Sequence, residues 1–289
     1  MERELWNLLY AVAMLLDKQV GEWKFSTGDI LTVYFWSVIH DRPMCWGVVK
    51  ANWPEDLRPV CLPSQSTLSR RMRSNNCQQL MTQIETTWLA LVVTSSFSVR
   101  IIDAKPIAVS GVTKDGDARH GRGAGGMQNG YKLFAIWPDG PLPIAWGLAG
   151  MNKSEKTMAR ELIPNLPGGG YLLGDPEYDS NALFDLAYHA GYQLVTPKRQ
   201  KHRGVGHRRQ SPYRLRSIEL MKHQFGKSLY RFRRQIERNF GNLTSFGGGL
   251  SGLPAWVRRF PRARNWIHAK LLINAARWFK KHPDLIALA

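Results

Sequence analysis

The chain has 289 residues, of which 40 are Lys or Arg and 22 are Asp or Glu, so its net charge is +18. Its 44% apolar content supports ordinary buried cores and its length suggests two domains, which excludes a wholly disordered chain. The longest apolar run, Leu5 to Leu16, is shorter than the roughly 20 residues of a membrane-spanning helix and precedes no signal-peptide cleavage site. We therefore expect a soluble intracellular protein with no membrane partner.

The cysteines and histidines exclude two common classes of small protein. Cys45, Cys61 and Cys77 are an odd number, spaced sixteen residues apart, and form no Cys-x-x-Cys pair. This argues against a disulfide framework and a zinc knuckle, and the histidines form no His-Glu-x-x-His motif. Acidic residues remain as the candidate metal ligands.

Residues 1–95 are predicted to be a mostly helical, DNA-binding domain. Apolar residues recur at helical spacing between Leu5 and Leu16, between Ile30 and Ile39, and again over 77–93. Between them, a short helix over 63–73 starts with Ser, Gln and Thr side chains and ends in arginines that include Arg70 and Arg71. This pattern fits a recognition helix with phosphate-contacting arginines, and it equally fits a capped surface helix.

Residues 98–289 alternate strand and helix patterns, which predicts an α/β fold with a mixed five-stranded sheet. The expected strands cover 99–109, 130–137, 142–149, 171–174 and 192–196. The expected helices cover 154–163, 180–190, 228–243 and 263–281. The glycine-rich stretch 116–130 precedes a strand and lacks a P-loop lysine, so we interpret it as a flexible connection rather than a phosphate cradle.

The positive charge lies entirely in the C-terminal third. Residues 198–289 contain 22 Lys or Arg against three acidic residues, a net +19, whereas residues 1–197 sum to −1. The densest part is an irregular basic insertion at about 198–217. Its basic residues are expected to contact phosphates, and they include Lys198, Arg199, Lys201, Arg208 and Arg209. Such a surface favours a nucleic acid over an anionic membrane, because the charge spans several elements rather than one amphipathic helix.

Two carboxylates stand at positions where an unpaired charge is costly. Asp103 lies inside an apolar strand, and Asp175 ends the strand that follows the helix over 154–163. A salt bridge to Lys105 or Arg100 is the structural alternative for Asp103. A third acid, Glu237, shares one face of the helix over 228–243 with Tyr230, Arg233 and Thr244. Taken alone, Glu237 also fits an ordinary helix-face ion pair with Arg233. Three carboxylates from separate elements suit two Mg²⁺ ions, which prefer oxygen ligands.

These blocks resemble the DDE transposases of bacterial insertion sequences, in the insertion sequence four and five group. The resemblance covers about residues 98–280 and rests on IIDAKPI, LLGDPEYDS and YRFRRQIERNFGNLTSFGG in this order. Tyr230, Arg233 and Glu237 match the Tyr-Arg-Glu-Lys signature of that group in type and spacing, while Thr244 occupies the lysine position.

The resemblance implies a ribonuclease-H-like core in which Asp103, Asp175 and Glu237 are catalytic and hold two Mg²⁺ or Mn²⁺ ions. It implies cleavage at the terminal inverted repeats of the element, followed by strand transfer into target DNA. Tyr230, Arg233 and Arg238 would contact DNA, with Arg238 near enough to replace the missing lysine. It also implies a homodimer or higher oligomer on double-stranded DNA, in a bacterial cytoplasm and associated with the nucleoid.

Two other functions fit the same core. Thr244 in the lysine position is compatible with a catalytically impaired, transposase-derived DNA-binding protein. A structure-selective nuclease would cleave DNA with the same carboxylates but would not join it.

Overall fold

The computed structural model describes residues 1–18, 24–93, 97–109, 111, 114–123, 125–200, 203–205, 209–244, 249–250 and 252–285. By its internal contacts the chain divides into two compact units. A helical unit comprises Met1–Val92, Val109–Asp117 and Leu243–Ala289, and a sheet unit comprises Val93–Ala108 and Ala118–Asn242. The two units therefore alternate along the chain. The functional domain limits expected above, 1–95 and 98–289, stay a prediction.

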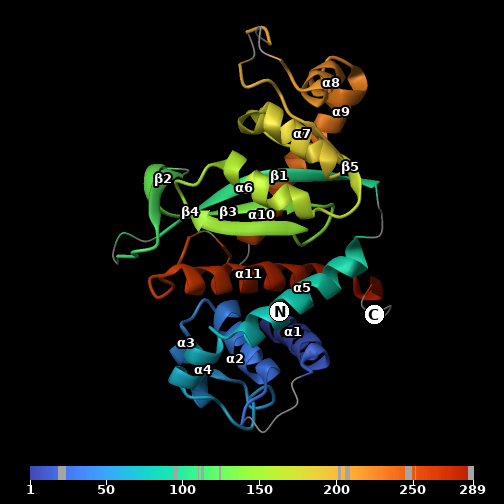
Figure 1. Cartoon of the computed structure of the whole chain (residues 1–289). Coiled ribbons are helices and arrows are strands. Elements are labelled where there is room, and N and C mark those ends of the chain that lie inside the picture. The colour runs from blue at the N-terminus through green and yellow to red at the C-terminus, as the bar shows by residue number, and fades with distance from the viewer. Residues whose placement is uncertain are drawn as a thin grey trace. The chain divides into compact units, whose positions relative to one another are not determined.

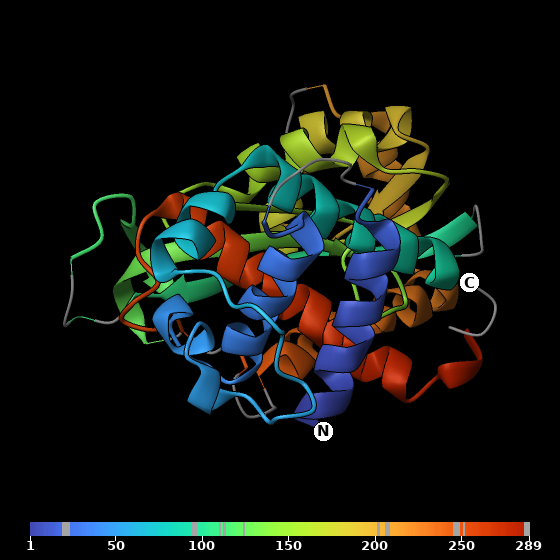
Figure 2. The same cartoon turned by 90° about the horizontal axis from the view of Figure 1, so that it is seen from below.

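The helical unit is built on α1 (Glu2–Leu16), α2 (Thr27–Ile39), α5 (Asn75–Val92) and α11 (Phe260–Lys280). Shorter elements complete it: α3 (Met44–Gly47), η1 (Lys50–Asn52), α4 (Gln65–Arg71) and η5 (Pro283–Leu285). Helix α11, red in Figures 1 and 2, packs against α1, α2 and α5, which are blue to teal. Within the described ranges, no helix combines the length and apolarity that crossing a membrane requires.

Helix α2 forms the core of this unit. Of its 13 residues, 12 are buried, as expected for a helix that is apolar on every side. It starts with a capping box, in which Asp29 N donates to Ser26 Oγ and Ser26 N donates to an Asp29 carboxylate oxygen. Neighbouring helices α1, α3, α4, α5 and α11 surround it.

Polar contacts fix α11 within the helical unit. Its first backbone amides are capped by a distant segment, since Arg259 N donates to Asp115 Oδ2 and Phe260 N donates to Asp117 Oδ2. In its middle, the buried Lys270 Nζ donates to Val38 O at 3.0 Å and to Asp41 Oδ1 at 2.5 Å. Part of the C-terminal positive charge is therefore internal and does not contribute to a DNA-binding surface.

The sheet unit contains a mixed six-stranded sheet with the order β2-β3-β1-β5-β6, in which β4 also pairs with β3. The strands are β1 (Phe97–Ala108), β2 (Arg119–Gly123), β3 (Gly126–Trp137), β4 (Ala145–Gly150), β5 (Gly169–Leu173) and β6 (Tyr192–Val195). β1 runs antiparallel to β3 and parallel to β5, and β5 runs parallel to β6.

Strand β2 corrects the expectation of five strands. It lies in the glycine-rich stretch that we interpreted as a flexible connection, and it pairs antiparallel with the start of β3. Glycine has low strand propensity, and the side-chain alternation that identifies a strand is weak in this stretch. Close backbone packing explains the glycines, since a Cβ on Gly121 would lie 2.5 Å from the Met151 carbonyl oxygen.

Helices cover both faces of the sheet. On one face, α6 (Glu155–Leu162) and α7 (Asn181–His189) pack on a buried cluster that includes Ile102, Ile136 and Leu172. On the other face, the Tyr171 ring contacts Phe225 of α9 (Gln224–Arg231), and the Trp137 ring contacts Phe240 of α10 (Gln235–Thr244). The remaining elements are η2 (Ile163–Asn165), η3 (Pro176–Tyr178), α8 (Pro212–Leu220) and η4 (Phe232–Arg234). This mixed sheet with flanking helices is a ribonuclease-H-like core, as expected.

The region over 224–244 differs from the continuous helix expected over 228–243. It is divided into α9, η4 and α10, with a 3₁₀ segment at Phe232–Arg234. A 3₁₀ helix turns about 120° per residue instead of about 100°, so three residues rotate the following side chains by roughly 60°. The faces of α9 and α10 are therefore out of phase.

Candidate metal centre

The register of β1 and β5 places two aspartates opposite each other. The last pair of this parallel ladder joins Ile101 to Leu173, where β5 ends. Continued by two residues, the same register aligns Asp103 with Asp175. The carboxyl ends of parallel strands are where α/β sheets bind ligands, because the chain diverges there and leaves side chains accessible.

Asp103 is mostly buried in the middle of β1. Its side chain is 20% exposed, and its Oδ1 accepts a hydrogen bond from Ala104 N at 2.8 Å. Its Oδ2 accepts from Arg233 Nη2 at 3.2 Å, so its cationic partner is Arg233 rather than Lys105 or Arg100. Burial raises the pKa of Asp103 to about 6, and the nearby Asp175 and Glu155 carboxylates add to this rise against the opposing effect of Arg233.

Asp175 is held by the turn that follows β5. Its Oδ1 accepts from Glu177 N at 2.8 Å, which caps η3. Its backbone oxygen accepts from Thr196 Oγ1 at 2.8 Å, which ties the turn to the end of β6. The position of Asp175 is thus fixed from two sides.

Glu155 is the third carboxylate of this cluster, and we did not predict it from the sequence. It is the first residue of α6, and Lys132 Nζ of β3 lies 3.4 Å from its Oε1. Its Oε2 is buried. Burial raises the pKa of Glu155, and the charge of Asp175 raises it further, while Lys132 and a hydrogen bond from the buried Tyr178 hydroxyl lower it.

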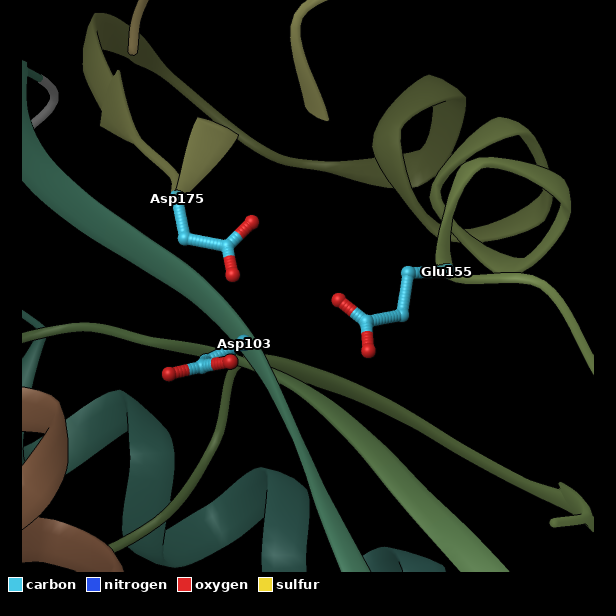
Figure 3. Close-up of side chains that lie close together, drawn as sticks. All are labelled: Asp103, Glu155 and Asp175. Carbon is cyan, nitrogen blue, oxygen red and sulfur yellow. The ribbon is translucent and has the colours of Figure 1, made fainter. Parts of the chain in front are cut away.

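One oxygen from each of Asp103, Glu155 and Asp175 lies within 4.8 Å of the other two. Figure 3 shows the three carboxylates pointing toward a common space, from β1, α6 and the turn after β5. The raised pKa values of Asp103 and Glu155 show that the charged forms are disfavoured there. A donor set made only of carboxylate oxygens fits a hard divalent cation such as Mg²⁺ or Mn²⁺.

Two residues of the Tyr-Arg-Glu signature, Tyr230 and Arg233, contact this site, and the third, Glu237, is not part of the carboxylate cluster. Arg233 contacts Asp103, and the Tyr230 hydroxyl donates to Gly174 O at 3.1 Å, next to Asp175. Glu237 is not a member of the three-carboxylate cluster, and it is exposed on α10 beyond the 3₁₀ segment. The single helical face expected for Tyr230, Arg233 and Glu237 is therefore interrupted.

The remaining predicted DNA-binding residues differ in their surroundings. Arg238 is exposed on α10, and Arg209 and Arg70 are exposed as well. Lys198 Nζ donates to Arg203 O at 2.9 Å, and Arg199 forms an ion pair with Glu177 at 3.4 Å. Lys201 and Arg208 lie outside the described residues.

Arg71 makes contacts inside the helical unit. Its guanidinium donates to Phe25 O at 3.2 Å and to Thr27 Oγ1 at 3.3 Å, at the start of α2. These bonds give Arg71 a structural role in joining α4 to α2.

Comparison with known proteins agrees with this site. The family model described as a transposase DDE domain matches residues 94–273, which include β1, the whole sheet and most of α11. Neither the curated proteins nor the solved structures contain a match. Since the match covers more than half of the chain and spans the carboxylate cluster, this chain belongs to the DDE-domain family of transposases.

Proposed function

We propose that this transposase cleaves DNA at the terminal inverted repeats of its own insertion sequence and joins the freed ends to target DNA. The observation that carries the proposal is the oxygen cluster of Asp103, Glu155 and Asp175 at the carboxyl edge of the sheet. The cluster lies within the matched DDE domain, which supports metal-dependent phosphodiester chemistry.

The chain would supply the site as follows. When bound, two Mg²⁺ or Mn²⁺ ions would activate the attacking oxygen and stabilise the leaving oxygen of an in-line displacement. Asp103, on β1, and Asp175, in the turn after β5, would hold the ions. Arg233 orients the Asp103 carboxylate through its hydrogen bond, and Thr196 fixes the backbone that carries Asp175.

We assign the third catalytic carboxylate to Glu237 and an auxiliary metal-binding role to Glu155. The signature supports Glu237, which follows Arg233 by four residues. The contact of Arg233 with Asp103 anchors that segment at the site. The geometry supports Glu155, because one of its carboxylate oxygens lies within 4.8 Å of an oxygen of each aspartate.

Two displacements account for the reaction. In the first, a water oxygen forms a bond to the phosphorus at the element end, and the P–O bond to the 3′ oxygen breaks and leaves a 3′-hydroxyl. In the second, this hydroxyl attacks a phosphodiester of target DNA, and one P–O bond forms as another breaks. The second step exchanges one phosphodiester for another, so it needs no external energy source. Neither step requires a covalent intermediate with the protein.

DNA recognition is divided between two regions in this proposal. The N-terminal helices would recognise the element ends, and exposed basic residues of the C-terminal third would bind the backbone. The protein would act as a homodimer or a higher oligomer, because an element has two ends that must be brought together.

A cleavage and joining assay tests the proposal. Imperfect inverted repeats flanking the gene supply the substrate, and the reaction is followed with Mg²⁺ and with EDTA. We expect wild-type protein with Mg²⁺ to release 3′-hydroxyl ends and to form joined products, and Asp103→Asn or Asp175→Asn to lower both by about a thousandfold or more, on the scale of lost catalytic groups. Full activity of either variant would overturn the assignment.

The same assay separates the two glutamates. Glu237→Gln should abolish both steps if it is the third catalytic carboxylate, while Glu155→Gln should raise the Mg²⁺ concentration needed for half-maximal rate and leave the saturated rate closer to wild type. The reverse pattern would give the catalytic role to Glu155. Cleavage of unrelated branched DNA without joined products would favour the nuclease instead.

Thr244 favours one further candidate, a DNA-binding protein with impaired catalysis. The signature has a lysine at this position, and Thr244 cannot supply its positive charge. End binding without strand transfer in wild-type protein, restored by Thr244→Lys, would support this candidate. Strand transfer by wild-type protein would exclude it.

A further inference from the structure

Helix α5 presents an unusual surface to solvent. Apart from Ala90, its exposed residues carry amides and hydroxyls rather than charges: Asn75, Asn76, Gln79, Thr82, Gln83 and Thr86. The single charged residue within the helix, Glu85, is 8% exposed and therefore points inward. Exposed helix faces are usually rich in Lys, Glu and Arg. An uncharged polar face of this length is therefore unusual for a helix that is merely exposed to solvent.

This amide face forms a crest between two polar grooves. On one side, a groove of about 600 Å³ lies between α5 and the start of α11, and its lining includes Gln78, Thr82 and Arg264. On the other side, a groove of about 260 Å³ lies between α5 and the α1–α2 region, and its lining includes Asn76 and Lys18. Gln79 and Gln83 line both grooves, so they stand on the crest itself.

Buried polar contacts hold the crest in place. His268 Nε2 of α11 lies 2.8 Å from Glu85 Oε2, and both side chains are about nine-tenths buried. Asn265 Nδ2 donates to Met72 O at 2.7 Å, just before α5 begins. Arg264 Nη1 lies 3.5 Å from Gln78 Oε1, so the arginine beside the crest is already directed toward it. The crest is thus preorganised, which reduces the entropy cost of binding.

The charges around the crest are complementary to phosphates. Arg70 and Arg73 are exposed just before α5, Arg264 lines the larger groove, and Lys18 lines the smaller one. Asp17, which also lines the smaller groove, accepts a hydrogen bond from Gly28 N at 2.6 Å at the start of α2. Uncharged hydrogen-bonding groups in the middle with cations on both sides match a DNA major groove, where base edges lie between two phosphate backbones.

We propose that the crest of α5 reads the base sequence of double-stranded DNA in the major groove, and this inference rests on the proposed function. An α-helix about 10–12 Å wide fits the major groove, which is about 12 Å wide. Asn and Gln amides pair in bidentate fashion with adenine N6 and N7, so the crest favours adenine-containing sites. A protein partner would be expected to contact aromatic or aliphatic anchors, and the crest residues named above include none.

This proposal places sequence reading in α5 rather than in α4. The 63–73 segment matched a recognition helix in sequence, but its N-terminal hydroxyls bind one another and the backbone. Ser64 Oγ accepts from Thr67 N at 3.2 Å and lies 3.0 Å from both Ser66 Oγ and Thr67 Oγ1. With Arg71 directed into the helical unit, α4 has fewer groups for base contacts than α5.

Selection of binding sites from randomised double-stranded DNA tests the inference with the full chain. Three proteins are compared: wild type, a crest variant with Asn75→Ala, Gln79→Ala and Thr82→Ala, and a matched α4 variant with Gln65→Ala and Ser66→Ala. All substituted residues are largely exposed, and alanine favours helix, so circular dichroism and thermal unfolding should confirm that the variants fold.

We expect wild type and the α4 variant to select the same site. The crest variant should lose at least about tenfold of its preference for that site over random DNA, since each bidentate pair with a base accounts for roughly 5- to 150-fold of discrimination. Its affinity for random DNA should change less than about twofold, because phosphate contacts provide that affinity. Arg264→Ala should weaken binding to both DNAs alike.

Three outcomes would overturn the inference. If the crest variant keeps the selected site, α5 does not read sequence, although the proposed function stands. If the α4 variant loses the site instead, α4 is the reader. If wild type binds no DNA, the inference and the proposed function fail together.

Discussion

The ionised Asp103 carboxylate destabilises the folded state of the metal-free protein. It is mostly buried, it lies near two other carboxylates, and its pKa rises from 3.8 to about 6. A raised carboxyl pKa means that the folded state binds a proton more tightly than the unfolded state does. The contribution of Asp103 to stability is therefore greatest below about pH 4. It is lost as the pH rises from about 4 to about 6.

Asp103→Asn should therefore stabilise the metal-free protein at neutral pH. We expect a gain on the order of 1 to 3 kcal/mol over wild type at pH 7.5, which shrinks toward zero as the pH falls to about 4, as proton linkage requires. Urea unfolding in EDTA at both pH values measures it, and adding Mg²⁺ should stabilise wild type more than the variant. A loss of stability at pH 7.5 would contradict this account.

Asp179 offers a matched control with the opposite sign. Its carboxylate pairs with Arg214 through two hydrogen bonds of 2.6 and 2.8 Å. Burial acts to raise the pKa of Asp179, but the hydrogen bonds and charge of Arg214 together with the hydrogen bond from Arg199 N outweigh it, so the pKa is lowered. Asp179→Asn should consequently reduce stability at pH 7.5, where the paired carboxylate stabilises the fold.

Sequence patterns identified the two aspartates because each breaks a local rule. A charge inside an apolar strand and a charge at a strand end both require a compensating ligand or partner. Glu155 breaks no such rule, since a glutamate in the first turn of a helix is favoured by the helix dipole. Glu155 is brought to the aspartates by the register of β1 with β5 and by the packing of α6 on the sheet. Both are features of the tertiary structure that the local sequence does not reveal.

At the scale of elements, the sequence predicted the long apolar strands and helices, but it did not predict the glycine-rich strand β2 or the 3₁₀ turn η4. Strands β1, β3, β5 and β6 and helices α6, α7 and α11 fall where periodicity indicated them. Strand β2 was missed because its glycines have no side chains to alternate, and η4 was missed because a 3₁₀ turn leaves the apolar pattern almost unchanged. The faces of α9 and α10, and with them the position of Glu237, depend on that turn.

The contact of α11 with the loop after α2 illustrates the asymmetry of a buried ion pair. Lys270 is 1% exposed, whereas the Asp41 side chain is 37% exposed. Burial lowers the pKa of Lys270 despite Asp41, which means that the environment as a whole disfavours the ammonium charge. Removing the charge should therefore cost less than removing its partner.

We expect Asp41→Asn to destabilise the protein by about 1 to 3 kcal/mol, because it leaves a buried ammonium without its anion. Lys270→Met, which fills a similar volume, should stay within about 1 kcal/mol of wild type. Denaturant unfolding of the two variants at pH 7.5 measures the difference. A larger loss for Lys270→Met would show that the pair itself is strongly favourable.

At the scale of the whole molecule, the net charge of +18 overstates the surface available to DNA. Lys270 and Arg258 are buried, and Arg214 is paired with Asp179. Exposed cations remain in the basic insertion, among them Arg199, Arg203 and Arg209. Composition could predict a polyanionic partner, but the division into internal and external charges required the fold.

Replacing Arg199, Arg203 and Arg209 with alanine should weaken binding to all DNA sequences and flatten its salt dependence. The slope of log K against log salt should fall by up to about 0.9 for each phosphate that the variant no longer neutralises, so by up to about 2.7 for three. A matched variant with Arg42→Ala, Lys50→Ala and Arg58→Ala removes the same charge from exposed positions of the helical unit. Titrations at several salt concentrations compare the two, and equal slopes would mean that the insertion does not bind backbone.

The alternation of the two units along the chain has a consequence for synthesis on the ribosome. Helix α2 is buried on nearly all sides. One of the helices that pack against it, α11, is translated more than 200 residues later. Until α11 emerges, the nascent N-terminal helices lack part of their apolar packing and the sheet unit is made in between. A product that stops before residue 260 lacks α11 and cannot complete the helical unit, so the surface that we propose to read DNA forms only once α11 has been translated.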